Sequence, residues 1–347
     1  GNNDTASITF GGVEFTTLET QLFTADDYNI NGADSTFGSD NSNITFADGG
    51  ATDISIDLGA GANLNINTEV GGGGIGNIAI NAAIKRIAAG DGDDALDITL
   101  DAGTGTLSVE AINTGINDVA LTGSTITLND DITTAGDSDN TGADGIDGAV
   151  IITGAALLET VADIAIDTSS SDGSVSFSST VNSAANKTLT ISSGAGAVDF
   201  AGVIGGVASK HLGGLAINAQ GSSTGTGTID ILQIGDTTGP EYGVEGVVTI
   251  GNTATADVTF DGAEYVVNGA LTVTSTSGEK ILFTGAAATT VQTAQDAIAF
   301  NTGTIQLAGS TPLTINSAGG AISVNSVMSA GSTDDNDVTI NANSDFG

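Results

Sequence analysis

The chain has 347 residues, of which 39% are hydrophobic and only 4% aromatic, with 51 glycines and neither cysteine nor tryptophan. Its formal net charge of −37 comes from 42 acidic and 5 basic residues. Such a surface repels nucleic acid and anionic lipid, which excludes both classes of partner. The sequence also lacks an apolar run of 18 residues, so no membrane insertion is expected.

The composition indicates a folded chain with very many turns. Asp outnumbers Glu by 33 to 9, and Asp, Gly, Ser, Thr and Asn are turn formers, which assigns most of the acidity to loops. A mean hydropathy of +0.19 and many β-branched residues argue against disorder. The lack of cysteine fits an exported protein, and a start at Gly1 without Met predicts a processed product whose leader was removed.

In chain order, one small unit recurs: an apolar residue, any residue, an apolar residue, then a turn. This alternation with period two predicts short strands that have one buried and one solvent-facing side. Helical periodicity is confined to Phe15–Asp27 and Thr289–Ala297, where a turn or two of helix is expected. The predicted strand cores are 8–10, 44–46, 64–66, 78–80, 107–109, 126–128, 164–166, 175–177, 189–191, 258–260, 271–273, 305–307, 313–315, 322–324 and 338–340.

Two all-β architectures explain many short strands. A row of β-sandwich domains would have strands of about 5–6 residues, whereas a parallel β-solenoid has shorter strands in near-continuous repetition. The three-residue cores favour the solenoid. At about 20–25 residues per coil, residues 1–347 are predicted to form a single continuous parallel β-helix of roughly 14–17 coils. Residues 1–30 interrupt the repeat, which suggests an N-terminal cap or an assembly segment.

A family resemblance lies in Thr188-Leu-Thr-Ile-Ser-Ser-Gly-Ala-Gly-Ala-Val-Asp-Phe-Ala-Gly-Val-Ile-Gly-Gly206, followed by Leu215-Ala-Ile-Asn-Ala219. This stretch resembles the repeats of giant bacterial β-strand-repeat surface proteins, which are similar to filamentous-haemagglutinin and autotransporter-type adhesins. The resemblance is clearest over about residues 181–330. It implies export, a right-handed parallel β-helix and a role in adhesion or cell-surface structure, and it carries no catalytic residue.

Calcium is the cofactor that the acidic loops favour, because it needs several oxygen ligands close together on a flexible loop. A first candidate site resembles an EF-hand loop without its final Glu, and comprises Asp137, Asp139, Thr141, Asp144 and Asp147. A second resembles one copy of a calcium-binding nonapeptide, and comprises Asp91, Asp93, Asp94 and Asp97. A third is the run 334–337. The alternative interpretation is that all three are acidic turns solvated by water.

The sequence predicts a protein that is not an enzyme. His211 is the only histidine, and it is interpreted as a solvated loop residue. Solenoid polysaccharide lyases and hydrolases remain the enzymatic alternative, because paired carboxylates can hydrolyse glycosides. Outward Thr runs could also form a hydroxyl ladder of the ice-binding kind, although Thr is simply a good strand former. Asn43 and Asn186 fit the N-glycosylation pattern, which arises easily by chance in such a chain.

A solenoid ends in a rung of unpaired N–H and C=O groups that can template another chain. The predicted function is therefore that of an extracellular structural protein, a subunit of a cell-surface filament assembled head-to-tail as a homopolymer. The alternative is a stalk or binding segment of a large surface adhesin or surface-layer protein, with a glycan or a cell surface as its target.

Overall fold

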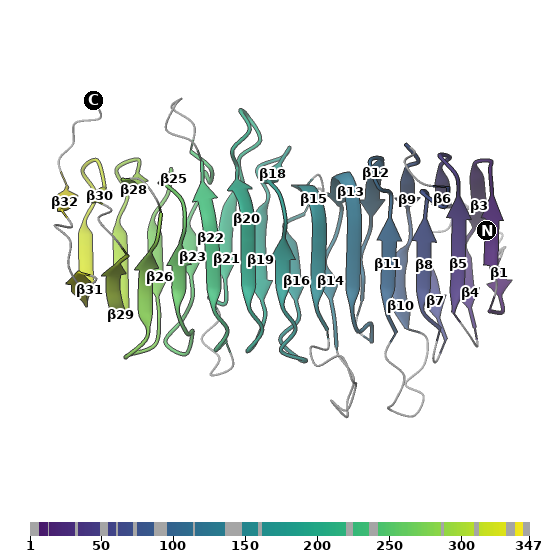
Figure 1. Ribbon diagram of the computed structural model, residues 1–347, viewed down its shortest axis with the longest axis horizontal. Coiled ribbons are helices and arrows are strands. Elements are labelled where there is room, and N and C mark those ends of the chain that lie inside the picture. The colour runs from purple at the N-terminus through teal and green to yellow at the C-terminus, as the bar shows by residue number, and fades with distance from the viewer. Residues whose placement is uncertain are drawn as a thin grey trace, which may run out of the picture. The chain divides into compact units, whose positions relative to one another are not determined.

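The structure is a computed structural model that describes residues 7–12, 14–31, 34–48, 55–59, 62–71, 75–86, 96–113, 115–135, 148–158, 162–219, 225–235, 242–285, 288–308, 312–330 and 337–342. The described chain is all-β and forms two compact units, Gly1–Ser174 (unit 1) and Val175–Gly347 (unit 2). Each is a parallel β-solenoid, drawn from purple to teal and from teal to yellow in Figure 1. None of the described residues forms a helix, so they include no helical segment that could cross a membrane.

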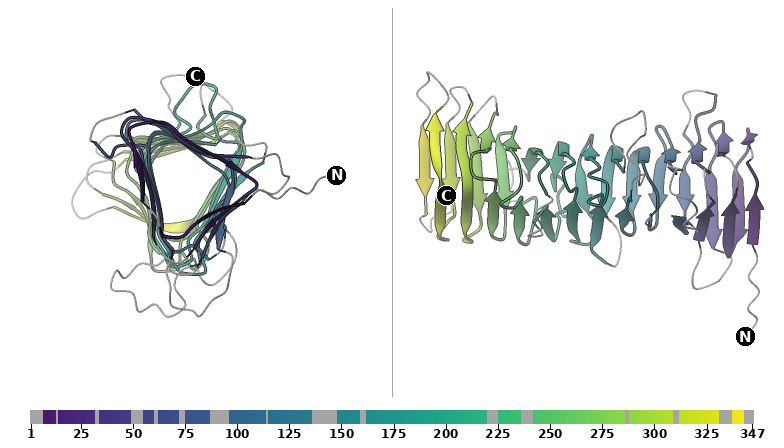
Figure 2. Two further views of the ribbon diagram at one scale, coloured as in Figure 1. Left: turned by 90° about the vertical axis from the view of Figure 1, so that its right-hand side faces the viewer. Right: turned by 90° about the horizontal axis from the view of Figure 1, so that it is seen from below.

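In unit 1, three columns of parallel strands enclose a three-sided interior, which is seen along the coils in Figure 2. The first column is β1 (Ser7–Phe10), β4 (Asp27–Ile30), β7 (Ser55–Leu58), β10 (Ala83–Arg86), single bridges at Ile112, β14 (Ile132–Thr133) and β16 (Ile164–Asp167). The second is β2 (Glu14–Thr17), β5 (Ser35–Ser39), β8 (Leu64–Asn67), β11 (Ile98–Asp101) and the first halves of β13 (Val119–Leu128) and β15 (Val150–Leu158). The third is β3 (Gln21–Ala25), β6 (Ile44–Asp48), β9 (Ile78–Ile80), β12 (Thr106–Val109) and the second halves of β13 and β15.

Unit 2 repeats the three-column plan. One column is β17 (Val175–Phe177), β20 (Val198–Ile204), β22 (Ile229–Ile234), β24 (Val258–Phe260), β27 (Lys280–Phe283) and the second halves of β29 (Ile298–Leu307) and β31 (Ile322–Ala330). The next is β18 (Val181–Ser183), the ends of β20 and β22, β25 (Glu264–Val267), β28 (Thr289–Thr293), β30 (Leu313–Asn316) and β32 (Val338–Asn341). The last is β19 (Thr188–Ser192), β21 (Gly214–Ile217), β23 (Val248–Ile250), β26 (Leu271–Thr274) and the first halves of β29 and β31.

The core consists of the alternate apolar side chains of each strand, which point inward and stack on their equivalents in the next coil. All fifteen predicted strand cores lie within observed strands. The stacking is direct: the rings of Phe177 and Phe200 are 4.8 Å apart at 5°, and those of Phe260 and Phe283 are 5.0 Å apart at 15°. Because parallel in-register pairing places equivalent positions above one another, like side chains stack along each column and fill the interior.

Two expectations are corrected. The two units comprise about 11 turns in total, fewer than the 14–17 predicted, because each turn carries three strands and loops of variable length. Ser7 pairs with Asp27, 20 residues on, whereas Leu64 pairs with Ile98, 34 residues on. The two segments expected to be helical are also strands, since Glu14–Thr17, Gln21–Ala25 and Thr289–Thr293 pair in parallel with the next coil. In Thr289–Thr293 alternate residues are buried, which is the period of a strand.

Each unit has a buried tyrosine at one of its corners. The hydroxyl of Tyr28 accepts the Ala25 N–H at 3.0 Å, and that of Tyr265 accepts the Gly262 N–H at 2.7 Å. Each hydroxyl also lies within 3.0 Å of main-chain carbonyl oxygens, those of Phe23 and Ala47 for Tyr28 and those of Ile231 and Leu232 for Tyr265. The ring fills the core while the hydroxyl satisfies main-chain groups that the corner leaves unpaired.

Glycine is required where successive corners approach most closely. In unit 1, Gly76, Gly105, Gly123 and Gly154 lie above one another, and a Cβ on Gly105 or Gly154 would overlap the carbonyl oxygen of the glycine below. Unit 2 has an equivalent column in Gly213, Gly246 and Gly269. The glycines in these columns therefore permit coil-to-coil contact rather than loop flexibility.

We expect Gly105→Ala to destabilise unit 1 by roughly 1–3 kcal/mol, because the added methyl must push apart two coils whose spacing is fixed by main-chain hydrogen bonds. Urea unfolding followed by circular dichroism measures the effect. Gly11→Ala is the matched control, since a Cβ there meets nothing within 4 Å. Equal stability of the two variants would contradict the proposed role of the glycine column.

Candidate functional site

The predicted calcium sites fall mostly on residues that the structure does not describe. Asp137, Asp139, Thr141, Asp144 and Asp147 lie outside the described residues, as do Asp91, Asp93, Asp94 and the run 334–336. Asp97 and Asp337 are described. Within the described ranges, no three acidic, His or Cys side chains are grouped so that they could hold a metal ion. Calcium at these loops therefore stays a prediction.

Asp97 belongs to a polar ladder along one corner of unit 1. Each ladder residue accepts, through a side-chain oxygen, the main-chain N–H of the equivalent residue in the next coil. The acceptors are Asp34, Asn63, Asp97 and Asp118, and the N–H groups are those of Asn63, Asp97, Asp118 and Ala149, respectively. The four N···O distances are 3.3, 2.8, 3.3 and 2.8 Å. Asp97 also accepts the Asn117 side-chain amide at 3.1 Å. Its carboxylate thus joins coils, which is a structural role that the sequence reasoning missed.

A sequence signal for this ladder exists. Each ladder residue directly precedes the first residue of a strand, and the same position elsewhere holds Asn43, Asn77, Asp131 and Asp257. Those four side chains likewise accept main-chain N–H groups of the next coil. An Asp or Asn immediately before an apolar-any-apolar unit therefore marks a corner acceptor, because short polar side chains readily bond nearby main-chain groups.

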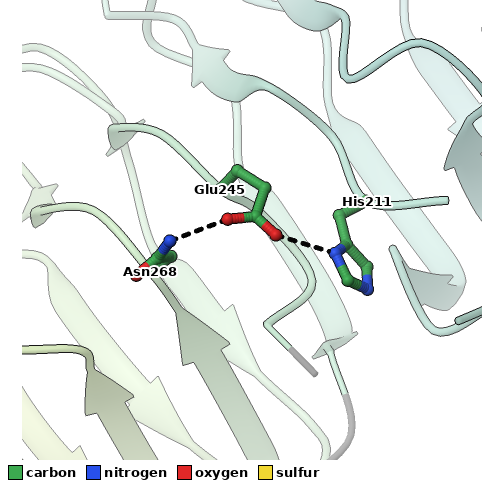
Figure 3. A network of polar contacts seen from close by, with 3 residues as sticks. All are labelled: His211, Glu245 and Asn268. Atoms are coloured by element: carbon green, nitrogen blue, oxygen red, sulfur yellow. Dashed lines mark hydrogen bonds and ion pairs between the residues drawn. The ribbon is translucent and has the colours of Figure 1, made fainter. Parts of the chain in front are cut away.

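The only histidine belongs to a three-residue network in unit 2 (Figure 3). The Nδ1–H of His211 donates to Oε1 of Glu245 at 2.9 Å, and the Asn268 side-chain amide donates to Oε2 of the same carboxylate at 2.7 Å. Bridges between Leu212, Val244 and Val267 place the three side chains on successive coils. The His211 side chain is only 13% exposed, so the interpretation of it as a solvated loop residue was wrong.

The network stabilises the ionised form of its carboxylate. Hydrogen bonds from Asn268 and then from His211 hold the pKa of Glu245 below its ordinary value. Tyr242 lies beside this group, and burial followed by the charge of Glu245 raises the pKa of its phenol. One carboxylate therefore links three coils at a single corner.

Elsewhere the same register brings like charges together. Asp199 of β20 pairs directly with Asp230 of β22, and both side chains point outward from adjacent strands. Burial, followed by the charges of Asp230 and Asp261, raises the pKa of Asp199. In unit 1, burial and then the charge of Asp130 raise the pKa of Glu110. These carboxylates lie close together despite their mutual repulsion. Among the described residues, they do not belong to a group that could hold a metal ion.

The first described coil of unit 1, formed by β1, β2 and β3 and here called the head coil, is filled with aromatic rings. Phe10, Phe15 and Phe23 contribute one ring from each strand, with centroids 5.5, 5.6 and 6.3 Å apart. All three also contact Phe37 of the next coil. Phe37 is fully buried, but Phe15 is 39% exposed. The head coil therefore presents aromatic surface on its far side.

The last described coil of unit 2, formed by β31 and β32 and here called the tail coil, exposes aliphatic side chains. Val338 is 38% and Ile340 49% exposed, while Leu313 and Ile315, their partners on β30, are fully covered. Met328 is exposed over Ile305, its buried partner on β29. The head and tail coils are thus the described places where core-type positions meet solvent.

No known protein family, curated protein or solved structure matches the chain.

We expect Glu245→Ala to destabilise unit 2 at pH 7 by roughly 0.5–1 kcal/mol, a value reduced by solvent exposure of the pair. A carboxylate whose pKa is lowered by folding contributes stability above its unfolded pKa, and that contribution is lost as the pH falls through the folded pKa. The difference from the unmodified protein in urea unfolding should therefore shrink on acidification to about pH 3. Glu279→Ala, at an exposed position, serves as the control.

Asp199→Asn should have the opposite effect and stabilise unit 2 at pH 7 by roughly 0.2–1 kcal/mol, because it removes a like charge facing Asp230. A carboxylate whose pKa is raised by folding favours the folded state below its unfolded pKa, and this contribution is lost as the pH rises through the folded pKa. The gain should therefore disappear at low pH. Thermal unfolding at pH 7 and pH 3 tests this, and a loss of stability at pH 7 would contradict it.

Proposed function

We propose that the chain is an extracellular structural protein, the subunit of a cell-surface filament or fibre that assembles head-to-tail. The tail coil carries this proposal. Val338 and Ile340 occupy inward positions of the same column as Leu313 and Ile315, yet solvent reaches them on the side away from β30. A further coil would cover these side chains on that side.

The construction of both units supports a structural role. Each coil is bound to the next by parallel main-chain pairing, stacked apolar residues and side-chain ladders, so the contact that would join two molecules is the contact that already joins coils. A net charge of −37 keeps the lateral surfaces mutually repulsive, which favours contact at the apolar coil faces over side-by-side aggregation. The resemblance to bacterial surface-protein repeats agrees with an extracellular location.

Electron microscopy of the purified chain, over a range of concentrations, tests the proposal. We expect uniform unbranched filaments whose length increases with protein concentration, because heterologous contacts that do not close give open fibres. Separate particles at every concentration would overturn the filament role and favour a stalk segment of a larger adhesin, in which other residues of the polypeptide cover the same strands.

The predicted calcium loops add a second comparison. If calcium bound at these loops supports assembly, a chelator should shorten or dissolve the filaments, and added calcium should restore them. Magnesium added in equal concentration is the control for general screening of the acidic surface. Filaments that are indifferent to chelation would remove calcium from the proposal and leave the assembly itself intact.

A further inference from the structure

We infer that the tail coil of one molecule stacks on the head coil of a second copy, so that the aliphatic residues of β31 and β32 cover the aromatic residues of β1, β2 and β3. This inference rests on the proposed filament function and assigns residues to its junction. Four properties of the described residues carry it: one-sided exposure, ring geometry, strand direction and charge.

The exposure of the tail coil is specific to one side. Thr339 faces outward between Val338 and Ile340, which both point toward the interior axis of unit 2. Their partners on β30 are buried because they lie between two coils. The tail residues are therefore covered by a coil on one side and open on the other. A flat partner with the same strand spacing covers the open side.

The head coil offers such a partner. Its three rings meet in the interior, one from each column, and Phe15 stacks on Phe37 at 5.6 Å with an interplanar angle of 6°. The outer face of Phe15 remains open, and Leu18, between β2 and β3, is 74% exposed. A broad apolar surface of this kind suits aliphatic side chains, and together they exclude water from the outer main-chain groups of both coils.

Strand direction selects a head-to-tail contact over its alternatives. Within both units every named strand pairs in parallel with the strand above it. A second copy that stacks head on tail continues this parallel register. Two identical faces related by a two-fold axis would instead meet with antiparallel strands, so their inward positions would not repeat the spacing of the coils below.

The distribution of charge also favours a head-to-tail contact. The apolar residues of the head and tail coils carry no charge, whereas outward positions of the columns carry stacked carboxylates such as Asp199 and Asp230. In a chain with 42 acidic and 5 basic residues, two copies repel along their sides. Association costs least electrostatically at these inward-facing apolar residues, and raised salt, which screens acids such as Glu14 of the head coil, should strengthen it.

The test uses two blocking variants of the full chain. Phe15→Asp places a charge on the head coil, and Ile340→Asp places one on the tail coil. Each variant alone should form no filaments. An equimolar mixture should give dimers and nothing larger, because only one junction can form between an intact tail and an intact head. Sedimentation velocity measures the species, and circular dichroism checks that each variant is folded.

Two further variants control the experiment. Leu18→Asp places a charge at an exposed position between β2 and β3 of the head coil, so it replaces Phe15→Asp if that variant unfolds. Ile151→Asp changes an exposed side chain on the lateral face of β15 and should leave filament growth unchanged. Loss of filaments in Ile151→Asp would show that lateral contacts drive assembly, which overturns the junction.

The outcomes separate this inference from the function on which it rests. If the unmodified chain forms no filaments, both fail. If it does form them but either blocking variant still polymerises, or a single variant forms discrete dimers, the assigned junction is wrong and the filament function stands. Dimers confined to the mixture support a heterologous junction between these two coils.

Discussion

Parallel pairing between successive coils is the constraint on which the rest of the structure depends. A three-residue strand has too little surface to bury on its own, and its main-chain groups find partners only in the coils above and below. Once each coil must match its neighbour in register, every position along a column becomes a repeated environment. The stacked rings of Phe177 and Phe200, the glycine columns and the ladder through Asp34, Asn63 and Asp97 are consequences of that repetition.

The repeated register between coils stabilises polar residues less uniformly than apolar ones. At a strand's entry corner, an Asp or Asn accepts an N–H of the next coil, so its charge or dipole contributes to stacking. In the middle of a strand the same register sets Asp199 against Asp230, and burial followed by this charge raises the pKa of Asp199. Glu245 escapes this conflict because its neighbours in the adjacent coils are His211 and Asn268. The groups that the register sets against an acid in the adjacent coils therefore decide whether it stabilises the fold.

The sequence predicts strands well and coils poorly, for a physical reason. A period-two pattern is local, so units such as Ile8-Thr9-Phe10 are recognisable without knowing what lies above them. The number of residues per turn depends on loops that vary from coil to coil, and on corners where two strands run together, as in β13 and β29. The partner of His211 lies 34 residues away, and only the coil register brings it near. The corner acceptors were predictable in principle, because their position before each strand is local.

In the filament proposed above, the surface that joins two molecules is the face of a coil. Interior coils bury both faces, and the same residue types that are covered at Leu313 and Ile315 are open to solvent at Val338 and Ile340. The forces that would close such a face are those already at work between neighbouring coils: apolar burial and parallel main-chain pairing. In the proposed junction, a covering coil that continues this pairing presents three short strands at the same spacing and in the same direction, as β1, β2 and β3 of the head coil do.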